Sequence, residues 1–504
     1  MPPPPRTLFL GIDAGEPSLI QRWGDEGVMP VLAALRARAL WGTTVNAPGI
    51  YTGSVWPSFH TGLEPGRHGR YFYRQLVPGT YRTARHPPSK LTAPVFWSRI
   101  GAAGRRVGVF DLPKAPLSRR LTGLQVADWG LHDPDGPPRS APPALAREIV
   151  ARFGKEPVGH CDLVAAGADA ARQLRDRLVE RVERKTEIIR HLLAREPWDL
   201  FAAAFGDCHC AGHHLWRLHD ASHPRHDALQ ARALGDPLRD VYAAVDRAIG
   251  RVLEAVGPET TVLVLASHGM GPHYGATFLL DDILRRLEGL PVAASSGLRQ
   301  LRSLWHRTPA VVRAPLTRAA DSFYHAAEAR GRAARRCFLV PTNDNCAGIR
   351  INVTGREPRG VVRRGAEYDG FCAKLEADLK GIVNVETGAP LVREVVRSKE
   401  AFPGSHCAEL PDLLVRWNRE APIRIVRSPT IGTIEREYGG IRNGDHRNPG
   451  MFFAHGPGIA AGRREQPVSI TDFAPTLAAL AGVELDDVDG APIPELCGVA
   501  AGAR

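Results

Sequence analysis

The sequence predicts an α/β fold in which helices flank a doubly wound, mostly parallel central sheet. Two observations predict this class. Short, nearly continuous apolar runs turn polar at their C-terminal ends, as interior strands of a parallel sheet do. Amphipathic helical patterns alternate with these runs, and that order is typical of a doubly wound sheet.

The predicted elements follow this order along the chain. The four strands are TLFLGID at residues 7–13, RVGVFDL at 106–112, WDLFAAAFGD at 198–207 and TVLVLASHG at 261–269. Helical periodicity is present at residues 28–39, 168–196 and 240–257. Nearer the C-terminus, strands are expected within residues 347–360, 409–418 and 451–458, and a capped helix at 469–482.

One segment interrupts the alternation. Residues 276–340 are rich in Arg and Ala, have helical periodicity and lie between two strand-like runs. We interpret this segment as an inserted helical cap. The core of the protein would then consist of residues 1–275 and 341–504.

The length and composition of the chain are those of a soluble globular protein and argue against a membrane or disulfide-rich protein. The chain has 504 residues, of which 43% are hydrophobic and 24% charged, as in soluble globular proteins. No apolar run approaches the roughly 20 residues that cross a bilayer, so no membrane partner is expected. The N-terminal run TLFLGI resembles a buried strand more than a secretory signal, which favours the cytoplasm. The eight cysteines are unevenly spaced and do not indicate a disulfide framework.

The net charge of +11 comes from arginines that are spread along the chain. A dispersed positive charge favours anionic small molecules or phosphates. A specific nucleic-acid partner is the competing interpretation, but no basic run interleaved with aromatic residues supports it. Nothing in the sequence indicates the oligomeric state.

Potential metal ligands and one candidate nucleophile stand where the predicted strands end. They are Asp13, Thr52, Asp207, His209, His213, Ser267, His268 and His446. His209 and His213 are one helical turn apart, so both imidazoles can reach one ion. Zinc, manganese and iron accept imidazole together with carboxylate. Any single histidine could instead be a hydrogen-bonded loop residue, and the hypothesis of a metal site depends on the joint pattern.

The chain resembles the alkaline phosphatase superfamily, in particular its type I phosphodiesterase and nucleotide pyrophosphatase family. The motifs that carry the resemblance are LFLGIDAGEPSLIQRW, TGSVWPSFHTGLEPGRHG, HCAGHHLW, LASHGMGPHYG, GIRINVTGREPRG, GDHRNPGMFFAHGPGI and SITDFAPTLAALAG. They follow the family's order from residue 7 to about 490. The resemblance implies an alkaline phosphatase-like fold and a phosphorylated small-molecule substrate.

The resemblance also implies residue roles. Asp13 is similar to a metal-bridging carboxylate, and Thr52 to the nucleophile that becomes phosphorylated. His213 and His446 resemble ligands of a first divalent metal ion, and His268 a ligand of a second. The metals would lower the pKa of the threonine hydroxyl and polarise the phosphoryl oxygen.

Three positions depart from the family pattern. His209 and Ser267 stand where the family has aspartates, so either one or two ions could bind. His209, His213 and His446 could form a three-imidazole zinc site with an open fourth position, and nearby Asp207 could compensate for a missing carboxylate. Tyr73 stands where an Asn holds a phosphate oxygen, and it could donate that hydrogen bond or serve only in packing. Asn343 and Asn345 could face the cleft or form an ordinary turn.

The sequence therefore predicts a metal-dependent phosphodiesterase with a phospho-Thr52 intermediate. A phosphomonoesterase or phosphoryl mutase of the same superfamily is the first alternative. A catalytically degenerate protein that binds phosphorylated ligands is the second, because two family carboxylates are missing. The sequence does not distinguish diester from monoester substrates.

Overall fold

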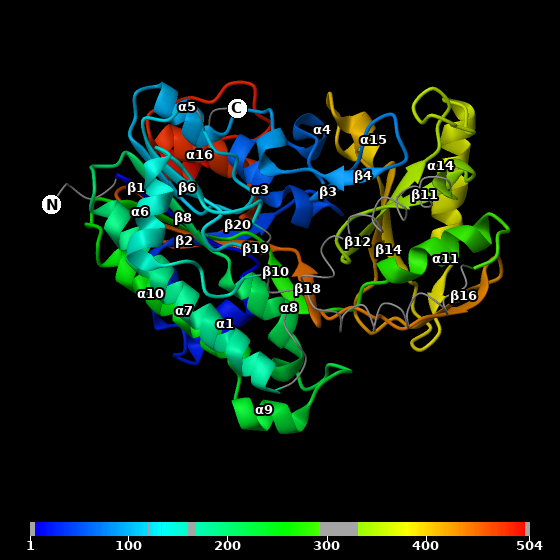
Figure 1. Ribbon diagram of the computed structural model, residues 1–504, viewed down its shortest axis with the longest axis horizontal. Helices are drawn as coiled ribbons and strands as arrows, with labels where there is room; N and C mark the ends of the chain where they lie inside the picture. Colours follow the sequence, from blue (N-terminus) through cyan, green and yellow to red (C-terminus); the bar gives the residue numbers. More distant parts are fainter. Residues whose placement is uncertain (1–5, 119, 133, 160–167, 293–330, 499–504) are drawn as a thin grey trace.

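The computed structural model describes residues 6–118, 120–132, 134–159, 168–292 and 331–498. A large lobe is built around a nine-stranded central sheet, and a small lobe of two antiparallel sheets lies beside it (Figure 1). Within the described ranges, no helix is both long and apolar enough to span a membrane.

The central sheet is mixed and mostly parallel. From one edge to the other, its strands are β20 (Gly462–Ser469), β2 (Leu40–Val45), β19 (Gly450–His455), β9 (Thr261–Ala266), β1 (Thr7–Ile12), β8 (Leu200–Phe205), β5 (Val107–Phe110), β6 (Gly123–Ala127) and β7 (Arg139–Ala141). Strand β19 runs antiparallel to both of its neighbours, and β7 runs antiparallel to β6. The other pairs are parallel, which confirms the expected class of sheet.

Helices cover both faces of this sheet (Figure 1). One face carries α1 (Pro17–Asp25), α2 (Pro30–Arg38), α6 (Ala144–Phe153), α7 (Ala168–Leu193), α8 (Asp207–His219) and α10 (Pro237–Leu253). The other carries α3 (Tyr51–Thr61), α5 (Phe96–Ala102), α16 (Phe473–Leu480) and α17 (Pro494–Cys497). Strand β1 shows why two layers form: Leu8 and Leu10 pack in the first core, and Phe9 packs in the second.

Several short elements connect the layers of the large lobe. They are α4 (Pro65–His68), β3 (Arg74–Leu76), β4 (Thr83–Arg85), α9 (Ala228–Leu234), and the antiparallel pair β10 (Gly269–Pro272) and β18 (Gly444–Arg447). The pair β10 and β18 extends beyond the end of β9, so it lies close to the carboxyl edge of the sheet.

The small lobe has a separate hydrophobic core. Its four-stranded sheet has the order β11 (Cys337–Val340), β12 (Cys346–Ile351), β15 (Leu413–Trp417) and β14 (Val392–Arg397). Its three-stranded sheet has the order β13 (Val383–Asn384), β16 (Ile425–Ser428) and β17 (Gly432–Glu435). Helices α11 (Thr277–Leu287) and α14 (Ala366–Lys380) pack against these strands.

The predicted helical cap at residues 276–340 maps onto the first part of the small lobe. Helix α11 lies in it, but Cys337–Val340 form strand β11, and residues 293–330 lie outside the described residues. Strands of the small lobe continue well past residue 340, within the range that the sequence assigns to the core. The domain boundaries at 276 and 340 stay a prediction.

The two lobes share a hydrophobic contact next to the start of α3. Ala47 and Ile50 of the large lobe pack with Cys346 and Leu414 of the small lobe. Gly49 makes this approach possible, because a Cβ there would lie 3.1 Å from Leu414 and 3.2 Å from the Cys346 sulfur. The β11–β12 loop is thereby held against the N-terminus of α3.

Helix α3 is buried along its whole length and includes His60. The Nε2 of His60 lies 2.8 Å from the carbonyl oxygen of Pro113 and donates a hydrogen bond to it. Burial lowers the pKa of His60 to about 3, although the hydrogen bond to Pro113 acts in the opposite direction. The imidazole is therefore neutral in the folded protein at neutral pH.

We expect His60 to make the folded protein sensitive to acid. Its pKa is about 3 in the folded state and about 6.5 in the unfolded chain, so the unfolded chain binds the extra proton between these values. The contribution of His60 to the free energy of unfolding is therefore greatest above about pH 6.5. It falls by about 1.4 kcal/mol for each pH unit between about 6.5 and about 3. Urea unfolding at neutral pH and at about pH 5 measures this slope. His60→Phe should show a shallower slope, and an unchanged slope would contradict the assignment.

Candidate active site

Three adjacent strands of the central sheet end at the same edge and supply most of the candidate site. Strands β9, β1 and β8 are parallel, and Ile12 at the end of β1 is in register with Phe205 and Ala266. Asp13 therefore follows β1 at the level where α8 follows β8 and Ser267 follows β9. This convergence is the geometry by which doubly wound sheets build ligand sites.

Three histidines form a cluster at this edge. The ligand atoms of His209, His213 and His446 all lie within 4.8 Å of one another. Helix α8 places His209 and His213 one turn apart, and strand β18 brings His446 beside them. Close approach of β18 to α8 requires glycine, because a Cβ at Gly444 would lie 2.0 Å from the carbonyl oxygen of Gly212.

His213 has the arrangement of a metal ligand. Its Nδ1 donates a hydrogen bond to the carbonyl oxygen of Gly444 at 2.8 Å, which fixes the tautomer and leaves the lone pair on Nε2. That Nε2 is buried and has no hydrogen-bond partner. Histidines that bind metals in proteins commonly donate their second ring N–H to a carbonyl in this way. The donor set therefore fits a divalent ion that accepts imidazole.

Two histidines of the cluster, His213 and His446, are neutral at physiological pH, as metal ligation requires. Burial lowers the pKa of His213 well below its usual value, and it does the same for His446, where the charge of His209 adds to the effect. Neutral imidazoles offer lone pairs without first losing a proton.

Asp13 and His209 are directly paired. The Nδ1 of His209 lies 2.7 Å from Oδ2 of Asp13, and Nε1 of Trp56 donates to Oδ1 at 2.8 Å. Burial alone would raise the pKa of Asp13, but the charge of His209 and its hydrogen bond outweigh burial and hold the pKa well below the usual value. Asp13 is therefore ionised, and it joins the histidine cluster to helix α3 through Trp56.

Ser267 and His268 complete the set at the end of β9. The Ser267 hydroxyl lies 2.9 Å from Nδ1 of His268 and 3.4 Å from Oδ1 of Asp13. The Nε2 of His268 lies 2.9 Å from Nδ1 of His446. Burial lowers the pKa of His268 to about 4 against the opposing charge of Asp13, and the charge of Lys114 adds to the lowering.

Thr52 is buried at the N-terminal end of α3, beside this group. Its hydroxyl donates a hydrogen bond to Oδ1 of Asn345 at 3.3 Å. Its neighbour Tyr51 packs edge to face against His268, with ring centroids 5.9 Å apart. The N-terminus of a helix stabilises negative charge, so this position suits a hydroxyl that reacts with a phosphoryl group.

A close backbone contact fixes the start of α3. A Cβ at Gly53 would lie 1.7 Å from the carbonyl oxygen of Tyr71, so only glycine fits after Thr52. The segment from Tyr71 to Tyr73 therefore lies directly over the first turn of the helix. Tyr73 itself is 41% exposed, and its ring packs on that of Phe72 at 4.6 Å. Its predicted contact with substrate stays a prediction.

Asp207 is not brought into the histidine cluster. Its Oδ1 lies 2.7 Å from Nε of Arg181, and both side chains are almost fully buried. On α8, Asp207 precedes His209 by two residues, and residues two apart do not share a helix face. The structure thus places Asp207 in a buried ion pair instead of at the metal site that we predicted for it.

Three residues near the site were not among the predicted site residues, although a place facing the cleft was one of the two interpretations of Asn345. Asn345 contacts the Thr52 hydroxyl, and Nζ of Lys114 donates to the Thr52 carbonyl oxygen at 3.2 Å. His132 stacks on His209, with ring centroids 4.4 Å apart. Asn345 lies in the small lobe, so no local pattern around Thr52 could decide between the cleft and the turn for it. Lys114 follows β5, which was predicted as a strand, so its place after a strand end was the available signal. His132 follows β6, which was not predicted as a strand, so the sequence offered no such signal for it.

Several residues with a left-handed backbone conformation lie in the turns at the carboxyl edge of the central sheet. Among the described residues other than glycine, five have positive φ angles of 54° to 62°. Four of them follow β1, β5 and β6, namely Ala14, Asp111, Lys114 and Asp128, and the fifth is Asp487. Each such residue costs on the order of 1 kcal/mol, and proteins keep this strain mainly where a site requires it. Four of these five residues therefore lie in turns at the edge of the sheet that carries the candidate site.

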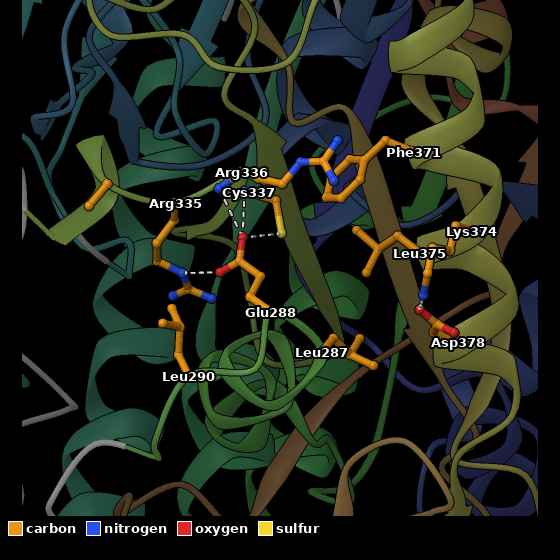
Figure 2. A pocket seen from close by; sticks show the side chains of 11 residues that line it. Leu287, Glu288, Leu290, Arg335, Arg336, Cys337, Phe371, Lys374, Leu375 and Asp378 are labelled. Carbon is orange, nitrogen blue, oxygen red and sulfur yellow. Dashed lines mark hydrogen bonds and ion pairs between the residues drawn. The ribbon is translucent and has the colours of Figure 1, made fainter.

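A cavity lies elsewhere in the protein and lacks such a set of side chains. In the small lobe, α11, β11 and α14 surround a cavity of about 340 Å³ (Figure 2). Glu288 at its wall accepts hydrogen bonds from Arg335 Nε at 2.7 Å and from the backbone N–H groups of Arg336 and Cys337. The Arg336 guanidinium lies over the Phe371 ring at 4.4 Å. These satisfied contacts serve to hold the end of α11 against β11.

The match to a family model identifies the protein as a phosphoric ester hydrolase. The chain belongs to the type I phosphodiesterase / nucleotide pyrophosphatase family, whose model matches residues 7–431. The resemblance seen in the sequence is thereby confirmed. The activity of the family is that of phosphodiesterases and pyrophosphatases, and the chain is a phosphohydrolase of this type.

Solved structures share the fold at low sequence identity. Phosphonoacetate hydrolase from Sinorhizobium meliloti 1021, in complex with phosphonoformate, is 14% identical with a TM-score of 0.54; the match covers 95% of this chain and 96% of that chain. Murine ectonucleotide pyrophosphatase / phosphodiesterase 5 is 12% identical with a TM-score of 0.50, over 96% and 97% of the two chains. These similarities confirm the alkaline phosphatase-like fold. No curated protein matches the chain by sequence.

Proposed function

We propose that the protein is a metal-dependent phosphodiesterase that works through a phospho-threonine intermediate at Thr52. The observation that carries this proposal is the buried Thr52 at the start of α3, at the same edge of the sheet as a cluster of three histidines in which Nε2 of His213 is an open ligand atom. Asp13 and Trp56 link the two parts, since Trp56 lies one turn after Thr52 and donates to Asp13. A phosphorylated small molecule is the substrate class that fits.

The ion would be held by His209, His213 and His446, and Zn²⁺ matches three imidazoles with one open position. When bound, such an ion polarises the phosphoryl group and lowers the pKa of an adjacent hydroxyl. Asp13 would contribute by accepting the Nδ1 hydrogen of His209, which orients that ring and makes it a stronger donor.

The residues around Thr52 would prepare it for attack. Asn345 accepts the hydroxyl hydrogen and thereby fixes the orientation of the oxygen. In the first step the hydroxyl loses its proton, its oxygen bonds to phosphorus, and the ester P–O bond breaks to release an alcohol that takes up a proton. In the second step water cleaves the P–O bond of phospho-Thr52, which releases the phosphate product and restores the hydroxyl. The N-terminal amides of α3 favour the negative charge in both steps.

The proposal is tested by hydrolysis of chromogenic phosphate esters. The chain is stripped of metal with a chelator and assayed on bis-p-nitrophenyl phosphate and on p-nitrophenyl phosphate. We expect diester hydrolysis to vanish on chelation and to return with Zn²⁺, Mn²⁺ or Fe²⁺. Preference for the monoester would favour the phosphomonoesterase alternative. Inactivity on both esters with every metal would favour the degenerate, ligand-binding alternative.

A further inference from the structure

The backbone of His446, one of the three clustered histidines, is held by an arginine of the small lobe. Arg419 follows the end of β15, and its Nη1 donates a hydrogen bond to the carbonyl oxygen of His446 at 2.6 Å. Its Nη2 lies 3.1 Å from Oδ2 of Asp445, in an ion pair. The two side chains are 12% and 3% exposed, so this pair is almost fully removed from water.

Asp445 completes a ring of contacts around His446. Its Oδ1 accepts a hydrogen bond from the backbone N–H of His446 at 2.8 Å, while its Oδ2 faces Arg419. Within the described residues, neither Oδ2 of Asp445 nor Nη2 of Arg419 has a hydrogen-bond partner, so the contact between them is electrostatic. Removal of either charge would leave the other one buried and uncompensated.

The large lobe leaves the carbonyl oxygen of His446 to Arg419. In the antiparallel pair of β10 and β18, Met270 lies opposite His446. The N–H of Met270 donates to Oε2 of Glu16 at 2.8 Å instead of to β18. Opposed residues of antiparallel strands alternate between hydrogen-bonded and non-bonded pairs, and this pair is non-bonded. The backbone of His446 is therefore positioned by Arg419 and Asp445.

The chain that carries Arg419 is fixed in the small lobe. Trp417, at the end of β15, is buried in the hydrophobic core of that lobe. The backbone N–H of Asn418 donates to the carbonyl oxygen of Leu391 at 2.9 Å. The guanidinium group of Arg419 therefore connects the small lobe to strand β18 of the large lobe.

The small lobe thus contacts both parts of the candidate site. Asn345 accepts the hydrogen of the Thr52 hydroxyl, and Arg419 holds His446. Burial raises the pKa of Tyr51, and the charge of Arg419 is the largest effect that opposes it, so Arg419 is close to the start of α3.

We propose that Arg419 is a positioning residue of the metal site, which together with Asp445 holds the backbone of His446 so that this imidazole reaches the same ion as the other two. This inference rests on the proposed function and names the residues through which the small lobe controls its metal site. Metal ligands must be held to within about 0.5 Å of their productive positions. Loss of a group that orients a ligand typically lowers metal affinity by about 10- to 100-fold.

The first test measures the affinity of the full chain for Zn²⁺ by competition with a chromophoric chelator. Arg419→Met should weaken zinc binding by at least about tenfold. An effect of charge alone would act in the opposite direction, because the loss of a nearby cation favours a bound dication. Zinc binding by Arg419→Met that equals or exceeds that of the native chain would overturn the inference.

The matched control is another arginine of the small lobe. Arg424 is exposed, and its Nε donates to Oε1 of Glu386 at 3.1 Å. Arg424→Met should bind Zn²⁺ as tightly as the native chain. Arg419→Lys keeps the positive charge and should bind Zn²⁺ more tightly than Arg419→Met, although one ammonium group lacks the fork that reaches both partners.

The second test asks whether Arg419 and Asp445 act as a pair. Asp445→Asn keeps the oxygen that accepts the His446 N–H and removes the charge, and it should also weaken zinc binding by about tenfold. The double variant with Arg419→Met should lose about the same factor, whereas a loss of about a hundredfold would show two independent effects and contradict the pair. If Arg419→Met does not fold, Asp445→Asn decides, since native zinc affinity in this isosteric variant would overturn the inference.

The inference and the proposed function fail in different ways. A pair that serves only stability would lower the free energy of urea unfolding of the metal-free chain and leave the zinc affinity of the folded variants unchanged. Together with diester hydrolysis by the native chain, that result would overturn the inference and leave the proposed function intact. A native chain that binds none of Zn²⁺, Mn²⁺ and Fe²⁺ would overturn both.

Discussion

Thr52→Ala is expected to lower kcat for a chromogenic phosphodiester by about a thousandfold or more. Removal of the nucleophile leaves only the general stabilisation by the helix N-terminus and neighbouring cations, which cannot form the covalent intermediate. KM should change little, because Thr52 would contribute mainly to the transition state. Steady-state kinetics on the metal-loaded protein measures both constants.

Two controls separate the nucleophile from a structural threonine. Ser54→Ala removes another buried hydroxyl of α3, which bonds to the carbonyl oxygen of Ile50, and it should stay active. Acid quenching of the native chain during turnover should trap phosphate on the peptide that contains Thr52. Full activity of Thr52→Ala, or phosphate trapped on a different peptide, would contradict the assignment.

His213→Ala is expected to abolish tight metal binding and to reduce diester hydrolysis by at least about a hundredfold. Its Nε2 is the buried, unpartnered ligand atom of the cluster, so two imidazoles would remain for the ion. The affinity for Zn²⁺ is measured by competition with a chromophoric chelator, and activity is measured at saturating metal.

The matched control for this variant lies in the same helix. His219 also belongs to α8, but its ring is held by Asp236 at 2.6 Å outside the cluster. His219→Ala should retain both the ion and the activity. Equal metal affinity in the native chain and His213→Ala would show that the three-histidine cluster is not the site.

The central sheet was predictable because its inner strands are buried on both faces. Strands β1, β5, β8 and β9 are continuous apolar runs, and their burial between two helical layers explains that composition. Strand β2, with the sequence LWGTTV, lies nearer the edge of the sheet, where burial alternates, and it was not predicted. In the small lobe only β12 and β15 were expected as strands. Strands such as β11 (Cys337–Val340) and β13 (Val383–Asn384) are only four and two residues long, which is too short for a clear sequence pattern.

From strand positions alone, only those site residues that directly follow a predicted strand could be predicted from the sequence. Asp13 and His268 follow neighbouring parallel strands, so the sequence pattern alone was enough to expect that they meet. Asn345 is separated from Thr52 by 293 residues, and its sequence context is that of a turn. Asp207 was included because it stands near His209 in sequence, but helical geometry turns it toward Arg181. Proximity along the chain was therefore a poorer guide than position at a strand end.

The contact between Thr52 and Asn345 joins the two lobes, which have separate hydrophobic cores. The hydroxyl belongs to the large lobe, the amide to the small lobe, and the hydrophobic contact around Ile50 and Cys346 holds them in register. The reaction at Thr52 would therefore depend on the contact between the two lobes. A substitution at this contact that separated the lobes by about an ångström would abolish hydrolysis. The secondary structure seen by circular dichroism and the unfolding transition of the central sheet would stay unchanged.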